Sequence, residues 1–324
     1  LMVMMAFLIL SMGLLSLAVG VVVRPAGVVM NRMNAGVAGV ALGSAESLGR
    51  LPGAWMKVTP EKRWKDGLVI FDMRFGGQAV HVDAGGGVMI DGGSEGAFFD
   101  VVGGALGEVG ARADTLVATH NDEEHVGGFL ELLERGGVKQ ILVPQDEVSH
   151  TLKRVVEAGE GVDARVIGAG LGRRLVIEEG VDLEVVWDGR GESGRAEDRG
   201  LVLRLHWAGW RILFTGDGGY LTERALLERG IEVEAEVWVC GRNRNDLVGS
   251  PAFVRAVNPE VVVFRDTFFP VHERVSAGWM RWLESEGVEL FDQAEEGAVY
   301  VKPREGALEV PGQVRGRKVV VEDD

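Results

Sequence analysis

The hydrophobic positions divide the chain into three stretches. Residues 1–23 form an apolar run without a charged residue, whereas residues 26–56 are weakly apolar and rich in glycine and alanine. From residue 66 onward, short apolar runs alternate with glycine clusters. About twenty apolar residues can span a bilayer as a helix, and a signal peptide would begin with a basic stretch that is absent here. We therefore expect the following organisation: a transmembrane helix over 1–24, a membrane-adjacent segment and linker over 25–65, a folded domain over 66–305 and a charged tail over 306–324. The last residues, 312–324, are expected to be frayed.

Within the folded domain, β-rich runs come first and strand–helix units follow. The pattern predicts strands at 68–72, 78–82, 87–91, 115–119, 140–143, 172–177, 181–186, 201–207, 210–215, 234–240 and 260–264. It predicts helices at 125–135, 148–158, 220–229, 250–257 and 273–287. Hairpins mixed with strand–helix units are typical of a layered α/β sandwich.

The composition narrows the possible chemistry. The formal net charge is −15, so the overall field of the protein does not attract DNA and any nucleic-acid contact needs a local basic patch. Cys240 is the only cysteine, which excludes an intrachain disulfide and a cysteine-based zinc cage. The first residue is Leu1 rather than a methionine, and we expect the chain to be a fragment of something longer.

A cluster of potential metal ligands follows the strand expected at 115–119. The sequence THNDEEHVGG, residues 119–128, places His120, Asp122, Glu124 and His125 on one turn before a helix. Imidazole and carboxylate groups together suit zinc, manganese or iron. The alternative is a solvated helix N-terminus, where acidic residues are favoured by the helix dipole.

A second candidate ligand stands at the end of another apolar strand. In LFTGD, residues 213–217, Asp217 follows the strand directly and precedes two glycines. A carboxylate at this position could bridge two metal ions, and such a pair can clamp the attacking and leaving oxygens of a phosphoryl displacement. The alternative role for Asp217 is the N-cap of the helix expected at 220–229.

These motifs resemble those of a known family. THNDEEHVGG resembles the H-x-[HD]-x-D-H-x-G-G signature of the metallo-β-lactamase superfamily. Further segments are similar, in order and spacing, to the C-terminal domain of ComEC-type competence proteins: FDMRFGG (71–77), MIDGG (89–93), LVLRL (201–205) with FTGD (214–217), AVNPEVVVF (256–264) and EEGAVYV (295–301). The resemblance covers about residues 66–302.

The resemblance implies an αββα sandwich and a role in the passage of DNA across the bacterial inner membrane. It implies that His120, Asp122, Glu124 and His125 are metal ligands, that Asp122 and Asp217 are catalytic, and that Asp217 also binds metal. It further implies zinc or manganese as cofactor, with DNA, the membrane and other competence proteins as partners. The membrane side of the domain stays open, because basic residues after the apolar run favour the inside and the resemblance favours the outside.

The sequence also departs from the family pattern. Glu124 replaces an aspartate, and a carboxylate misplaced by about 1 Å can cost roughly a hundredfold in rate. In VCGRNRN, residues 239–245, Arg242 and Asn243 stand where the family has two histidines, and an arginine repels a metal ion. His272 is a candidate substitute ligand.

Three interpretations follow from these departures. The favoured one is a nuclease-type domain with impaired catalysis and one ion or none, in which Arg242 and Arg244 contact DNA phosphates. The second is an active metal-dependent phosphodiesterase or DNase with substitute ligands. The third is a metallo-hydrolase of small esters or lactones, because one fold can serve several activities.

Overall fold

The computed structural model of the chain describes residues 2–49, 64–73, 77–145, 149–190, 197–241, 248–266 and 274–322. The chain divides into two compact units, Leu1–Thr59 and Pro60–Asp324. Each unit is described by itself.

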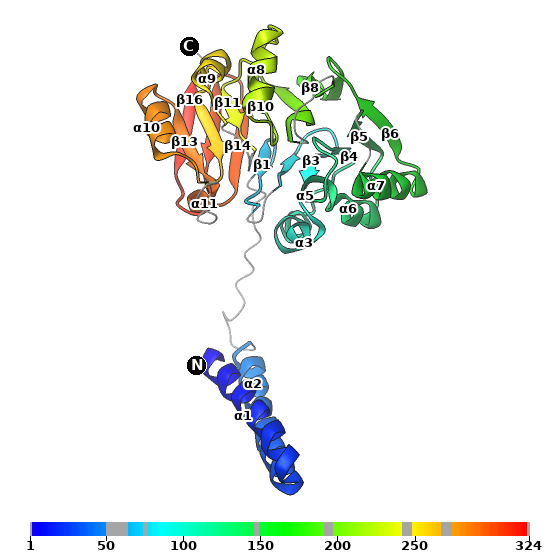
Figure 1. Ribbon diagram of the computed structural model, residues 1–324, viewed down its shortest axis with the longest axis vertical. Coiled ribbons are helices and arrows are strands. Elements are labelled where there is room, and N and C mark those ends of the chain that lie inside the picture. The colour runs from blue at the N-terminus through cyan, green and yellow to red at the C-terminus, as the bar shows by residue number, and fades with distance from the viewer. Residues whose placement is uncertain are drawn as a thin grey trace. The chain divides into compact units, whose positions relative to one another are not determined.

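The first unit is a pair of helices, α1 (Met2–Val22) and α2 (Arg24–Gly49), which pack against each other (Figure 1). At their junction Gly27 lies so close to Gly20 that a Cβ at position 27 would be 2.4 Å from the Gly20 Cα. The apolar run does form a helix, but the glycine- and alanine-rich stretch after it forms a second helix that the pattern did not predict.

The predicted transmembrane helix over 1–24 is not found in the structure. Along the described part of the chain, no helix combines the length and the apolar character needed to cross a membrane. The apolar run passes at Arg24 into α2, which carries charged residues.

The second unit contains two facing mixed sheets. The first sheet has the order β16 (Lys318–Glu322), β15 (Ala307–Pro311), β14 (Val299–Arg304), β1 (Leu68–Ile70), β2 (Ala79–Val82), β3 (Val88–Gly92), β4 (Thr115–Val117), β5 (Gln140–Pro144), β6 (Arg165–Ala169). The second has the order β13 (Glu289–Asp292), β12 (Val261–Phe264), β11 (Val237–Val239), β10 (Trp210–Phe214), β9 (Val202–Trp207), β8 (Val181–Trp187), β7 (Arg174–Glu178). Strands β3 to β6 are parallel, and so are β10 to β13.

Helices connect the strands in both sheets. They are α3 (Glu95–Ala97), a π-helix η1 (Phe98–Gly103), α4 (Gly104–Val109), α5 (Glu123–Val126), α6 (Phe129–Arg135), α7 (His150–Gly161), a 3₁₀ turn η2 (Glu197–Arg199), α8 (Tyr220–Glu228), α9 (Pro251–Val257), α10 (Ala277–Ser285) and α11 (Gln293–Glu296).

The alternation of side chains along each strand separates three apolar layers. Residues such as Ile90, Leu205 and Phe214 face the space between the sheets. The opposite face of the first sheet packs against helices through residues that include Phe129. The outer face of the second sheet packs in the same way, around Trp238. The prediction of an α/β sandwich with two sheets is therefore confirmed.

Several elements of the second unit were not predicted from the sequence, among them the strands β6, β13 and β15. Residues 95–109, where no element was predicted, form α3, η1 and α4 in succession. The end of the chain, predicted to be frayed, contains β16, which pairs with β15 over Lys318–Glu322. Val321 of β16 is buried in the layer between the sheets, which explains why a charged segment forms a strand.

Candidate metal centre

The first half of the site is the turn between β4 and α5. Asp122 is the N-cap of α5, and its carboxylate accepts a hydrogen bond from the backbone N–H of His125 at 3.2 Å. The same carboxylate contacts His125 Nδ1 at 2.8 and 3.0 Å through its two oxygens. An N-cap contact and a ring contact together fix the orientation of the buried His125 side chain.

The second half of the site is the loop that follows β10. Asp217 Oδ2 lies 3.6 Å from His125 Nε2, a buried atom that makes no hydrogen bond to the part of the chain that the structure describes. The rings of His120 and His125 have their centroids 4.4 Å apart. Asp217 does not cap α8, because the N-cap residue is Gly219. The structure therefore brings His120, His125 and Asp217 together from two different sheets.

His120 is oriented by a chain of hydrogen bonds that begins at Asp91. Asp91 accepts hydrogen bonds from Thr119 N at 2.7 Å and from Thr119 Oγ1 at 2.6 Å. Thr119 Oγ1 also lies 2.9 Å from His120 Nδ1. Because the hydroxyl donates its one proton to Asp91, it accepts from Nδ1–H, which leaves Nε2 of a neutral His120 unprotonated.

Two glycines make room for the His120 ring. A Cβ at Gly200 would lie 2.1 Å from His120 Nε2, and a Cβ at Gly216 would lie 2.8 Å from His120 Cε1. The start of β9 is tied to the same turn, because Leu201 N donates to Thr119 O at 2.8 Å. A side chain at position 200 would therefore displace the imidazole.

The Asp217 loop is held in place by another carboxylate, Asp198. This buried residue accepts hydrogen bonds from Thr222 Oγ1 at 3.1 Å and from Gly219 N at 3.4 Å. Both donors lie just beyond Asp217 in the chain. Asp198 therefore fixes the backbone that presents Asp217.

The charges of the site are strongly coupled. Burial alone would lower the pKa of His125, but the carboxylates of Asp217 and Asp122 outweigh it and raise this pKa well above the ordinary value. Burial favours the neutral form of Asp122, yet the hydrogen bond and charge of His125 lower its pKa to about 2. Burial would raise the pKa of Asp217, but the charge of His125 outweighs this effect and lowers the pKa. Without a cation, the imidazolium of His125 thus lies between two carboxylates.

The donor set fits a metal ion in place of the His125 proton. Two ligands about 2.0–2.2 Å from one tetrahedral zinc ion lie roughly 3.4 Å apart. The observed 3.6 Å between His125 Nε2 and Asp217 Oδ2 is close to that spacing. Asp122 on Nδ1 corresponds to the carboxylate–histidine–metal arrangement that orients many ligating histidines. Within the described ranges, however, no group of three or more such side chains is arranged to hold an ion.

Several predicted site residues do not enter this geometry. Arg242, Arg244 and His272 lie outside the described residues. Glu124 contributes through its backbone, because its N–H supports the Asp122 carboxylate and its carbonyl oxygen packs against Gly77. The roles predicted for these side chains stay predictions.

Sequence reasoning did not assign a role to Asp91, Thr119, Asp198 or Gly200. MIDGG and the threonine before His120 were visible signals for the first two. Asp91 has a positive φ of 52°, which is unusual for a residue other than glycine and marks a constrained position. Burial raises the pKa of Asp91 to about 7, although His125 and Thr119 act in the opposite direction.

We expect the metal-free protein to lose stability as the pH rises from about 4 to 8. Asp91 has a pKa of about 7 in the fold against 3.8 unfolded, and the pKa of His125 is raised above 6.5. Between these values the folded state binds more protons than the unfolded state, so its stability falls with pH. Denaturant unfolding in a chelator, at several pH values, measures the effect. An Asp91→Asn variant should lose the part of the slope below about pH 6, where His125 is protonated in both the folded and the unfolded state, and an unchanged slope there would contradict the assignment.

The sequence model of the metallo-beta-lactamase superfamily matches residues 75–285, more than half of the chain. No curated protein matches it.

Solved structures with a similar fold have low sequence identity. The metallo-beta-lactamase fold protein YhfI from Bacillus subtilis has 10% identity and a TM-score of 0.49, with 70% of this chain and 96% of that chain covered. Zn(2+)-bound PqqB from Methylobacterium extorquens has 12% identity and a TM-score of 0.42, with 66% of this chain and 85% of that chain covered. The diiron beta-hydroxylase CmlA from Streptomyces venezuelae has 14% identity and a TM-score of 0.49, with 70% of this chain and 53% of that chain covered.

Proposed function

Because the chain belongs to the metallo-β-lactamase superfamily, we propose that it is a metal-dependent hydrolase whose centre is reduced to one ion and whose substrate is the phosphodiester backbone of DNA. The observation that carries this proposal is the buried His125 Nε2, which has no hydrogen bond among the described residues and lies 3.6 Å from Asp217 Oδ2. Zinc or manganese is the expected ion, because both bind imidazole and carboxylate groups.

Each side chain has a distinct role in this proposal. His125 and Asp217 hold the ion, and the ring of His120 lies beside that of His125. Asp122 accepts a hydrogen bond from Nδ1–H of His125 and so directs the opposite ring nitrogen toward the ion. A bound ion would supply Lewis acidity at the phosphoryl oxygen and activate a water for attack.

The hydrogen bonds of Asp122 support a centre with one ion. Its carboxylate accepts from both the backbone N–H and the ring Nδ1 of His125, so it orients a ligand instead of binding a second ion. The sequence supports this in two more places, since Glu124 is longer than the family's aspartate and Arg242 and Asn243 replace histidines. We therefore expect slow hydrolysis.

DNA as substrate, and a ComEC-like role in DNA uptake at the bacterial inner membrane, are supported by the order of the sequence landmarks. In the structure MIDGG covers most of β3, and LVLRL covers the first part of β9. LFTGD runs from the end of β10 into the loop that follows, and AVNPEVVVF runs from the end of α9 through β12. Other competence proteins are the expected partners, and Arg242 and Arg244 are the proposed contacts to phosphates.

A nuclease assay with manganese or zinc tests the proposal. We expect the unmodified chain to nick DNA slowly, and the double variant Arg242→His, Asn243→His to cleave it at least tenfold faster, because the cation is removed and two ligands are added. Fast cleavage by the unmodified chain would favour an active DNase with substitute ligands. Hydrolysis of small esters or lactones with no action on DNA would overturn the choice of substrate.

A further inference from the structure

The last strand of the chain, β16, forms one edge of the first sheet. It pairs with β15 without a shift in register, from Pro311 opposite Lys318 to Ala307 opposite Glu322. In Figure 1, β16 lies on the left of the second unit and β6, the other edge of the same sheet, lies on the right. Within the described ranges no strand pairs with the other side of β16, so this side is open to an additional strand.

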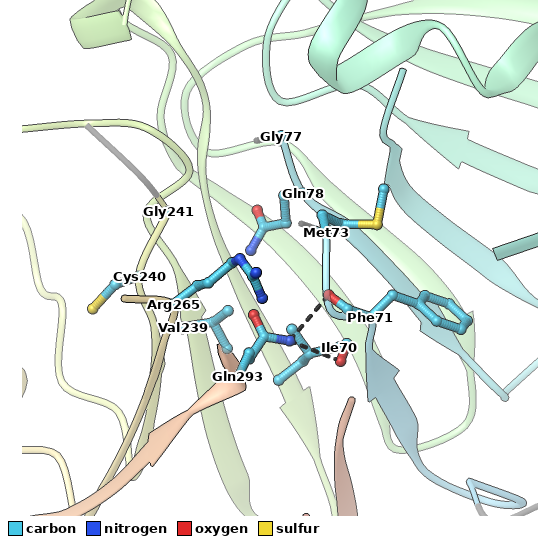
Figure 2. A pocket seen from close by; sticks show the side chains of 10 residues that line it. All are labelled: Ile70, Phe71, Met73, Gly77, Gln78, Val239, Cys240, Gly241, Arg265 and Gln293. Carbon is cyan, nitrogen blue, oxygen red and sulfur yellow. Dashed lines mark hydrogen bonds between the residues drawn. The ribbon is translucent and has the colours of Figure 1, made fainter. Parts of the chain in front are cut away.

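Contacts between the two sheets fix the position of this edge. Arg317, just before β16, donates to the carbonyl oxygen of Leu290 in β13. Gln293, just after β13, donates through Nε2 to the carbonyl oxygens of Ile70 and Phe71 at 3.1 and 3.0 Å (Figure 2). Both contacts join the edge of the second sheet to the first sheet. The strand β16 is therefore a fixed part of the sandwich.

The backbone of β16 presents regularly spaced donors and acceptors on the open side. Gly312 N donates to Arg317 O at 2.8 Å, which makes these two residues a hydrogen-bonded pair. In an antiparallel ladder, hydrogen-bonded and non-hydrogen-bonded pairs alternate. Arg317 and every second residue after it therefore bond to β15, whereas Lys318, Val320 and Glu322 direct their N–H and C=O groups away from it.

The side chains of β16 carry opposite charges at its two ends. The strand begins with Lys318 and ends with Glu322, and the three residues between them are valines. Val320 is 48% exposed, whereas Val321 is buried between the sheets. Lys318 forms an ion pair with Glu309 of β15 at 3.0 Å and is still half-exposed, and Glu322 is exposed. The open edge thus combines an exposed valine with charges whose order has a direction.

A second copy of β16 that runs in the opposite direction matches this edge. When Val320 lies opposite Val320 of the copy, Lys318 of each chain lies opposite Glu322 of the other. The same register aligns the outward-facing backbone groups of the two strands, so that all three residues form hydrogen-bonded pairs. A parallel copy in register would instead place like charges side by side. Because opposite charges across a strand pair stabilise it and like charges destabilise it, the edge selects an antiparallel copy of itself.

We propose that β16 is a homodimer interface, in which two chains join their first sheets into one continuous sheet across a two-fold axis at Val320. Such an interface uses the same patch of both chains, as most homodimers do. One pair of edge strands is small for a permanent complex, so the dimer is reversible. Five strands separate β16 from β4, which leads to the metal centre: β15, β14, β1, β2 and β3. The inference therefore does not depend on the proposed function.

The order of charges gives a direct test in sedimentation velocity experiments on the full chain. We expect a concentration-dependent dimer, which Lys318→Glu and Glu322→Lys each weaken by roughly tenfold or more, because each variant places two like-charge pairs in the interface. An equal mixture of the two variants should dimerise again, since every changed residue then meets an opposite charge. The matched control is Lys153→Glu, because Lys153 is also exposed and paired with a glutamate but lies in α7. This control should dimerise like the unmodified chain.

A cysteine at the centre of the interface tests the register. Val320→Cys should form a disulfide-linked dimer on oxidation, because the two Cα atoms of a hydrogen-bonded antiparallel pair lie about 5.5 Å apart, within the range of a disulfide. The matched control is Val162→Cys at the end of α7, since Val162 is 46% exposed and Val320 48%. The control should form far less linked dimer.

The outcomes separate this interface from association through another surface. Circular dichroism shows whether each variant folds, and dimers recovered in the mixture show that both charge variants keep the edge intact. A monomeric unmodified chain, or a dimer that neither charge variant weakens, would overturn the proposal. A mixture of folded variants that stays monomeric, or equal linking of the two cysteine variants, contradicts it as well.

Discussion

Replacing Asp217 by alanine is expected to weaken zinc or manganese binding by about a hundredfold or more and to remove hydrolysis. Groups that hydrogen-bond to metal ligands already contribute about 10- to 100-fold to affinity, and we propose Asp217 as a direct ligand, with its Oδ2 at 3.6 Å from His125 Nε2. Isothermal titration with each ion measures the affinity, and the nuclease assay measures the activity.

The matched control for this variant is Asp100→Ala. Asp100 is an exposed aspartate of η1, so its loss should change neither metal affinity nor rate. Asp217→Ala with an unchanged metal affinity would show that the ion, if any, is held elsewhere. That result would remove Asp217 from the centre.

The substitution Gly200→Ala is expected to lower activity by about a hundredfold without removing a ligand. The new methyl group would lie 2.1 Å from His120 Nε2, so the imidazole must move by more than 1 Å to restore a normal contact. A misplacement of this size in an active site can cost roughly a hundredfold. Overpacking of a filled interior also costs about 1–3 kcal/mol of stability. Rate measurements and denaturant unfolding follow the two effects separately.

A second glycine provides the comparison for this variant. Gly107 lies in α4 and has no atom within 4 Å of the position of a Cβ. Since alanine is favoured over glycine in a helix, Gly107→Ala should leave activity unchanged and stability equal or slightly higher. An active Gly200→Ala protein with an undisturbed His120 would contradict the packing account.

Many of the strands, and the turns that carry the proposed metal ligands, could be predicted from the sequence, because the local pattern of apolar and polar residues determines them. The alternation around 201–207 and 210–215 predicts β9 and β10, and the apolar run before His120 predicts β4. Since ligands that follow strand ends gather at one edge of a sandwich, the meeting of His120, His125 and Asp217 could be anticipated from the order of the motifs.

The rest of the site depends on contacts between segments that are distant in sequence. The hydrogen bonds from Thr119 to Asp91 join residues 28 positions apart, and the contact of Gly200 with His120 spans 80 positions. No local pattern encodes such pairs. The strand β16 was missed for the same reason, because it is held by its pairing with β15 and by the burial of Val321 between the sheets, and the segment around it is charged.

The most direct test of the account is to locate the metal by anomalous scattering in crystals of the full chain grown with zinc or manganese. The account predicts one ion at about 2.0–2.2 Å from both His125 Nε2 and an Asp217 oxygen, with Asp122 still on His125 Nδ1. Two fully occupied ions would contradict the reduced centre, and an ion remote from His125 and Asp217 would contradict the site itself.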